Sequence, residues 1–136
     1  MSEVAVFESG ATRNSDGHKY DFEGFLCPAV LERYGQYMHA NRKQADGTLR
    51  ASDNWQKGIP QPKYMSSLVR HTMDLWRLWD GWSVVDKDSG EKCDLETLCC
   101  AVMFNVMGLL HEELKKDLEN EGYLASSIIE THAQPT

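Results

Sequence analysis

The residues best suited to chemistry are cations gathered around a tryptophan in the middle of the chain. Residues 42 to 63 contain five basic and two acidic side chains: Arg42, Lys43, Arg50, Lys57, Lys63, Asp46 and Asp53. This local balance of +3 stands out in a chain whose formal net charge is -7. Positive charge beside Trp55 suits a ligand whose phosphate meets the cations and whose base stacks on the ring. The alternative is a solvated surface loop with ordinary lysines and arginines.

A second candidate site is a pair of arginines on one face of an expected helix. Arg70, Asp74 and Arg77 fall at positions i, i+4 and i+7, with His71 next to the first of them. Two guanidinium groups flanking a carboxylate can hold a diphosphate while the carboxylate orients them. The alternative is a surface ion pair worth under about 1 kcal/mol. A lone histidine such as His71 is more often a hydrogen-bonded structural residue than a base or metal ligand.

Asn105 is the one strongly polar residue in the apolar run from Cys99 to Leu110. If its amide is buried, it must find hydrogen-bonding partners. It can read the edge of a base or ribose, or it can cross-link two helices. Buried amides usually bond to the backbone or to neighbouring side chains, which favours the structural interpretation.

Signals for hydrolysis are weak. Metal-dependent nucleotide pyrophosphatases of the all-helical class place paired acids at i and i+3 on successive helices, so that carboxylates converge on magnesium. Here Glu91 pairs with Asp94, and a second acidic group contains Glu112, Glu113 and Asp117, but the helix between them has no matching pair. Neither a Gx4GK[ST] nor a GxGxxG phosphate loop is present. We therefore expect no catalytic residue, no metal and no cofactor.

A mainly α-helical chain must position these residues. The N-terminal residues 4 to 25 suit a small hairpin or an extended arm. Apolar spacing and helix-end signals then predict three principal helices: from Pro28 to about Asn41, from Pro62 to Asp80, and from Leu95 to about Leu118, with Asp94 as N-cap. The polar connection over residues 41 to 61 is long for a compact domain, so it is functional or mobile, and Trp55 suggests that part of it is pinned down.

The last helix is expected to need more protein than one chain supplies. From Leu95 to Leu110 it is apolar on nearly every face, so it must be surrounded. Three helices can barely surround one of their number, which predicts a homodimer, with further assembly of dimers open. The 136 residues are expected to form one ligand-binding domain over 1–120 and a flexible tail over 121–136.

Composition favours a soluble protein of the cytoplasm. The net charge argues against binding to nucleic acid polymers or to an anionic membrane. Four cysteines without a CxxC pair suggest reduced, mostly buried thiols. The N-terminus lacks the pattern of a signal peptide, and the longest apolar run, from Cys99 to Leu110, is too short to span a bilayer.

Four segments together resemble a phage-borne family: SGATRNSDGHKYDFEGFLCPAVLERYGQYM, SDNWQKGIP, YMSSLVRHTMDLW and LETLCCAVMFNVMGLLHEEL. They cover about residues 8 to 115, and the DNWQKGIP and RHxxD blocks are the most specific. The wider family is known as the N-terminal part of a dATP/dGTP diphosphohydrolase. The same motifs, with this length and a short N-terminal sheet, are also similar to the Thoeris anti-defence sponge proteins of phages.

The sponge resemblance implies a dimeric protein that captures, without cleavage, cyclic ADP-ribose isomers made by bacterial TIR proteins in the host cytoplasm. Some members also bind cyclic oligonucleotides at separate sites. Six positions match the family pattern: Arg13, Asn54, Trp55, Arg70, His71 and Asn105. The implied roles place Arg13 and Arg70 on phosphates and Asn105 on a ribose or base edge, within or across the dimer. Trp55, or a neighbouring aromatic such as Trp82, would stack on the base.

The wider family name implies a different activity, a magnesium-dependent dNTP pyrophosphohydrolase. At Gly90–Asp94 this chain reads GEKCD, where the wider family often has a histidine after the glycine, and this weakens the metal-site interpretation. The missing acid pair likewise favours capture over hydrolysis. An interaction module that blocks another protein directly, through the apolar last helix, is a third interpretation.

Overall fold

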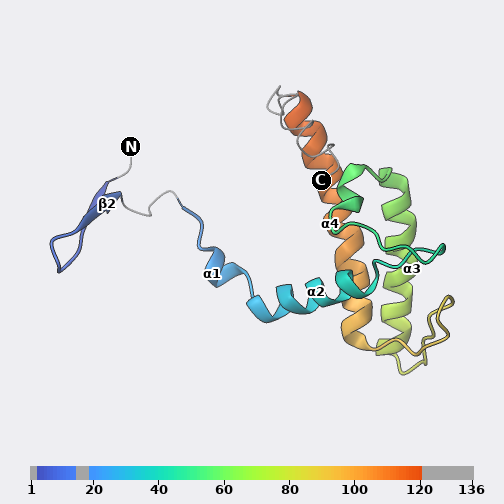
Figure 1. The fold of residues 1–136 in the computed structure, drawn as a ribbon. Helices are drawn as coiled ribbons and strands as arrows, with labels where there is room; N and C mark the ends of the chain where they lie inside the picture. Colours follow the sequence, from blue (N-terminus) through green and yellow to red (C-terminus); the bar gives the residue numbers. More distant parts are fainter. Residues whose placement is uncertain (1–2, 15–18, 121–136) are drawn as a thin grey trace. The chain divides into compact units, whose positions relative to one another are not determined.

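The structure, a computed structural model, describes residues 3–14 and 19–120 and divides the chain into two compact units, Met1–Glu32 and Arg33–Thr136. Figure 1 shows the helices and strands of both units, and each unit is described by itself. The described chain is mainly helical with an N-terminal hairpin, as the sequence predicts. The expected flexible tail, 121–136, lies outside the described residues, and the single domain over 1–120 stays a prediction.

The first unit carries the hairpin. Strand β1 (Val4–Val6) pairs with β2 (Thr12–Asn14) in antiparallel register, with Ala5 opposite Arg13. The aromatic segment that follows is not extended, because Phe22–Phe25 forms the one-turn helix α1. Asp21 explains the difference, since its Oδ1 accepts a hydrogen bond from the Gly24 N–H at 3.0 Å and so caps the turn.

Helix α2 (Pro28–Ala40) begins in the first unit and ends in the second. Pro28 stands at its first position, as expected, where a missing N–H costs nothing. Helix α3 (Gln61–Trp79) ends where the sequence predicts, followed by Gly81 at φ +92°, a backbone conformation that favours glycine. Between α2 and α3 lies the short 3-10 helix η1 (Asn54–Lys57).

The core of the second unit is the contact between α3 and α4 (Leu95–Asn120), which lie side by side in Figure 1. Tyr64 of α3 is 2% exposed, and its ring meets Phe104 edge-to-face at 5.8 Å. A Cβ atom at Gly108 of α4 would overlap the Tyr64 ring. Glycine at this position therefore allows the two helices to approach closely enough to bury the tyrosine.

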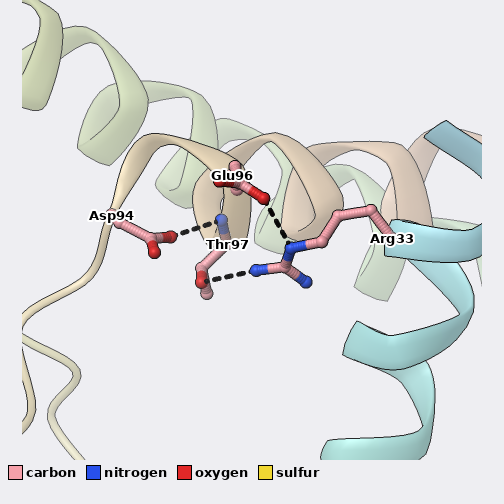
Figure 2. Close-up of polar contacts among 4 residues, drawn as sticks. All are labelled: Arg33, Asp94, Glu96 and Thr97. Carbon is pink, nitrogen blue, oxygen red and sulfur yellow. Dashed lines mark hydrogen bonds and ion pairs between the residues drawn. The ribbon is translucent and has the colours of Figure 1, made fainter. Parts of the chain in front are cut away.

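Figure 2 shows how the start of α4 is fixed. The Asp94 carboxylate accepts a hydrogen bond from the Thr97 N–H at 2.8 Å, which confirms the predicted N-cap. Arg33 of α2 donates from Nε to Glu96 Oε1 at 2.8 Å and from Nη2 to Thr97 Oγ1 at 3.4 Å. Through these bonds the part of α2 that belongs to the second unit is joined to the first turn of α4.

The apolar residues of α3 are divided between two faces. Tyr64 is buried and Leu68 and Leu75 are half-buried, whereas Met65 and Val69 are about half exposed. The reason is that apolar residues occur on both sides of this helix, and only the side with Tyr64 contacts α4. The thiols also differ from expectation, since all four are free but Cys27 is exposed and only Cys100 is fully buried.

Helix α4 is not surrounded within one chain. It buries Leu98, Ala101 and Gly108, whereas Val106, Met107, Leu110 and Leu114 are between 43% and 55% exposed. By length and composition, Leu95–Glu119 is also apolar enough to cross a membrane, which the twelve-residue run in the sequence did not suggest. Core helices of soluble proteins pass the same test, so this property is weak evidence about a membrane.

The tight contact at Gly108 gives a first prediction. We expect Gly108→Ala to lower the free energy of unfolding by about 1–3 kcal/mol, because the new methyl group overpacks the Tyr64 site. Urea denaturation followed by circular dichroism measures the loss. Gly35→Ala in α2 is the matched control: apart from the nearby backbone of its own helix, no atom lies within 4 Å of its added Cβ, so it should stabilise the helix by about 0.5–1 kcal/mol. Equal losses in both variants would contradict the packing argument.

The Asp94 cap predicts a pH dependence of stability. Hydrogen bonds from the Thr97 hydroxyl and backbone N–H lower the pKa of the Asp94 carboxyl in the folded state. A lowered folded pKa means that the carboxylate stabilises the fold above its unfolded value of about 3.9, and that this contribution is lost as the pH falls through the folded pKa.

We therefore expect Asp94→Ala to cost about 1 kcal/mol of unfolding free energy at pH 7, the usual worth of an N-cap. The difference from the wild type should shrink below about pH 4. Denaturant unfolding at several pH values measures it. Asp94→Asn is the control, because an asparagine caps a helix without titrating, so its stability relative to Asp94→Ala should not depend on pH. A pH-independent deficit in Asp94→Ala would count against the carboxylate as the origin.

Candidate functional site

A cavity of about 850 Å³ lies within the second unit. It is bounded by the end of α2, the connection over residues 41–52, the 3-10 helix η1, and the facing sides of α3 and α4. Its volume is typical of small-molecule sites, which occupy roughly 300–1,000 Å³. Among the described residues that line it are three permanent cations, Arg42, Lys43 and Arg50, and one carboxylate, Asp88. The cavity is therefore positive although the chain as a whole is acidic.

The cations are carried by a small, well-bonded loop. Lys43 and Leu49 form an antiparallel bridge, and the Arg50 N–H donates to the Arg42 carbonyl at 2.8 Å. At the tip, Asp46 Oδ1 accepts from the Thr48 hydroxyl at 2.6 Å and from the Thr48 N–H at 3.0 Å. These two bonds lower the pKa of the Asp46 carboxyl. The long connection predicted from the sequence is thus built as a hairpin-like turn with two arginines at its base.

Both arginines are anchored by groups other than carboxylates. Arg42 donates from Nε to the His39 carbonyl at 3.0 Å, and its Nη2 lies 3.2 Å from His39 Nε2. Because arginine has only donors, this second contact is a hydrogen bond when Nε2 carries no proton. Arg50 donates from Nη1 to the Asn41 carbonyl at 3.2 Å. Within the described chain neither guanidinium forms an ion pair with a carboxylate, so both keep their positive charge uncompensated.

Aromatic rings and an amide form another part of the wall. Trp55 of η1 packs edge-to-face on His111 of α4, with 4.8 Å between ring centroids. Phe104 lines the cavity and also contacts Tyr64. Asn105 is 3% exposed, and its Nδ2 donates to the Ala101 carbonyl at 2.9 Å. Its Oδ1 has no hydrogen bond to any other described residue, so this acceptor is not used within the described chain.

Several polar atoms beside this wall lack hydrogen bonds among the described residues. The buried atoms are His71 Nδ1, Tyr64 Oη, His111 Nδ1 and Glu112 Oε1. His111 Nδ1 and Glu112 Oε1 are 3.7 Å apart, which is an ionic separation rather than a hydrogen bond. Burial, and secondly the charge of Glu112, raises the pKa of the Tyr64 hydroxyl. His71 is the member of this group that lines the cavity.

The structure brings together four of the eight residues selected from the sequence. Asn54, Trp55, His71 and Asn105 all line the cavity, although they come from three separate elements. Arg13 belongs to β2 of the first unit.

The other three selected residues do not line this cavity. Arg70 donates to Ser66 Oγ at 2.8 Å and to Ser67 Oγ at 3.0 Å, while Arg77 donates to Asp74 Oδ1 at 3.0 Å. The diphosphate interpretation required Asp74 to orient both guanidinium groups. In the described part of the structure Asp74 pairs only with Arg77. Trp82 is 67% exposed.

The cavity also contains Arg42, Lys43 and Arg50, which the sequence indicated only as members of a cationic segment. Lining residues that the sequence did not indicate include His39, Ser67 and Phe104. The local charge balance of residues 42 to 63 was the available signal, but it did not show which cations share a cavity with Trp55. Lys57 and Lys63 contribute to the same balance and lie outside the lining.

The acids suggested for hydrolysis do not converge. Asp94 caps the first turn of α4, and Glu112 lies 18 positions further along, which places them about 27 Å apart on one helix axis. Across residues 3–14 and 19–120, no group of three or more His, Cys, Asp or Glu side chains is arranged to hold a metal ion.

Comparisons with known proteins add no further guide to this site. No protein-family model, curated protein or solved structure matches the chain.

Proposed function

We propose that the chain binds a small cyclic nucleotide, of the cyclic ADP-ribose type, and holds it without cleaving it. The observation that carries the proposal is the cavity of about 850 Å³, in which three permanent cations share a wall with Trp55, Phe104 and Asn105. A nucleotide needs these three contacts: positive charge for phosphate, a ring face for the base, and an amide for a polar edge. Asp88 is the one carboxylate among the described lining residues, so little opposes an anion there.

This function places the protein in the cytoplasm of a phage-infected cell. There it would act as an anti-defence sponge that lowers the free concentration of a signal made by TIR proteins. The support for this setting is the motif resemblance given by DNWQKGIP and RHTMD, together with the character of the cavity. Sequestration requires no catalytic group, no cofactor, no nucleic acid polymer and no membrane.

The competing function is a magnesium-dependent dNTP pyrophosphohydrolase. It requires several carboxylates around one metal ion. The separation of about 27 Å between Asp94 and Glu112 argues against a centre built from both. We therefore place capture first.

The test is a binding and release experiment. Purified protein is mixed with cyclic ADP-ribose and filtered, and the retained material is heated and analysed by mass spectrometry. We expect retention of the ligand by the wild type and its release intact. Trp55→Ala should weaken retention about tenfold, in line with the roughly 1–3 kcal/mol that base stacking contributes. Trp76→Ala, at an exposed tryptophan outside the lining, is the matched control and should bind normally.

Two outcomes would contradict capture. Recovery of cleaved nucleotide would show turnover, and pyrophosphate released from dNTPs with magnesium would favour the competing function. Absence of retention by the wild type would overturn the binding proposal itself.

We also propose that two copies associate through the exposed apolar face of α4. Val106, Met107, Leu110 and Leu114 are large apolar side chains left about half exposed by the single chain. Covering this face with a second copy would remove apolar surface from water, the main driving force for association. Larger assemblies of such dimers are compatible with this arrangement.

For the dimer we expect Leu110→Glu to give a folded monomer, because two buried carboxylates would face each other across the interface. Light scattering coupled to gel filtration measures the mass, and circular dichroism checks the helix content. Glu119→Lys, an exposed charge change on the opposite side of the same helix, is the control and should remain dimeric. A monomeric wild type would rule the interface out.

A further inference from the structure

We propose that the phosphates of the ligand bind to an anion subsite formed by Arg42 and Arg50, with His39 as the residue that positions Arg42. This assignment rests on the proposed function and deepens it, because it names the part of the cavity that recognises the charge. It also differs from the sequence-based assignment, which placed Arg70 on a phosphate. The ligand class it selects is a nucleotide with a diphosphate bridge.

Arg42 and Arg50 lie next to each other at the cavity. The Arg50 N–H donates to the Arg42 carbonyl at 2.8 Å, so the two residues are direct neighbours across the base of the loop. Both line the same cavity. Each guanidinium has five N–H donors, and the bonds to protein occupy two groups of Arg42 and one of Arg50. The remaining donors are available for the oxygens of an anion.

The two guanidinium groups also lack a carboxylate partner among the described residues. Arg33 and Arg77 each contact a carboxylate, Glu96 and Asp74 respectively. Arg42 and Arg50 are held by carbonyl oxygens and an imidazole ring, which carry no negative charge and so orient a guanidinium without neutralising it. Lys43 adds a third cation between them in sequence, on the same lining. Cations left unpaired beside a cavity attract an anion, and two neighbouring forks suit the several oxygens of a diphosphate.

Arg42 and its loop are already ordered by bonds within the protein. Arg42 is bonded to both the carbonyl and the ring of His39, so its guanidinium plane is fixed before a ligand arrives. The tip of the loop is fixed in turn by Asp46 and Thr48. A side chain that is already ordered loses less conformational entropy on binding. Arg70, by contrast, is bonded to Ser66 and Ser67 and does not line the cavity.

The experiment measures the affinity of the full chain for cyclic ADP-ribose, inorganic pyrophosphate and adenosine by calorimetry. We expect Arg42→Ala and Arg50→Ala each to weaken binding of cyclic ADP-ribose and pyrophosphate about tenfold or more, the usual effect of losing a charged hydrogen bond. Adenosine binding should change less than twofold. Arg70→Ala is the matched control and should leave all three affinities within about twofold of the wild type.

Two further variants separate position from charge. Arg42→Lys keeps the charge but cannot make both bonds to His39, so its loss should lie between those of the wild type and Arg42→Ala. His39→Ala should weaken binding of pyrophosphate less than Arg42→Ala does, and should not weaken it further when Arg42 is already alanine. Circular dichroism and thermal unfolding verify that each variant is folded.

The outcomes distinguish this subsite from the proposed function. Suppose that the wild type binds cyclic ADP-ribose, that Arg70→Ala abolishes this binding, and that Arg42→Ala and Arg50→Ala do not weaken it. The subsite is then wrong and capture stands. If pyrophosphate binds in an Arg42- and Arg50-dependent way but cyclic ADP-ribose does not bind, the subsite stands and the proposed ligand is wrong. If neither anion binds the wild type, both are overturned.

Discussion

The close approach of α3 and α4 at Gly108 is the contact on which the second unit depends. Tyr64 occupies the space that a side chain at position 108 would fill, and it is almost completely buried there. This contact sets the register between the helices. On α3, Ser67 and His71 follow Tyr64 at three and seven positions, so they lie on the same face and reach the cavity. Phe104 lies one turn before Gly108 on α4, where it contacts Tyr64 and lines the cavity as well. A change in this register would therefore alter the wall of the site as well as the core.

The positive part of the cavity is stabilised in a different way. Its loop is held by backbone bonds and by the short Asp46–Thr48 contacts, while the arginines bond to carbonyl groups and to His39. A carboxylate at either guanidinium would give a stronger local bond but would also compete with an anionic ligand. Within the described residues, the fold uses carboxylates for Arg33 and Arg77, outside the cavity lining. Arginines paired with carboxylates, Arg33 and Arg77, thus hold the fold together. The arginines of the loop have no such partner in this part of the chain and remain available to an anionic ligand.

The sequence was sufficient for the helices because their ends carry local signals. Pro28, Gly81 and Asp94 act within one turn of their own positions, and the structure has helix ends at all three. The buried side of α3 was not predictable, since Met65 and Leu68 are both apolar and only tertiary contact selects Leu68. The same reason limits the site. Trp55 could be selected by residue type beside the cations, and His71 and Asn105 through the motif resemblance. The choice of Arg42 and Arg50 over Arg70 depends on a loop geometry that no local pattern encodes.

Helix α3 carries an exposed apolar stripe on one side and part of the cavity wall on another, so a protein bound to the stripe and a ligand in the cavity can coexist. Met65, Val69 and Met73 are exposed apolar residues, at i, i+4 and i+8. The cavity residues Ser67 and His71 are each offset from this stripe by two positions, which is about 200° around a helix of 3.6 residues per turn. The apolar stripe and the cavity wall therefore lie on opposite sides of α3. A second copy or another protein covering the stripe would leave the α3 wall of the cavity in place, so burial of this apolar surface and capture of a small ligand do not compete for the same face.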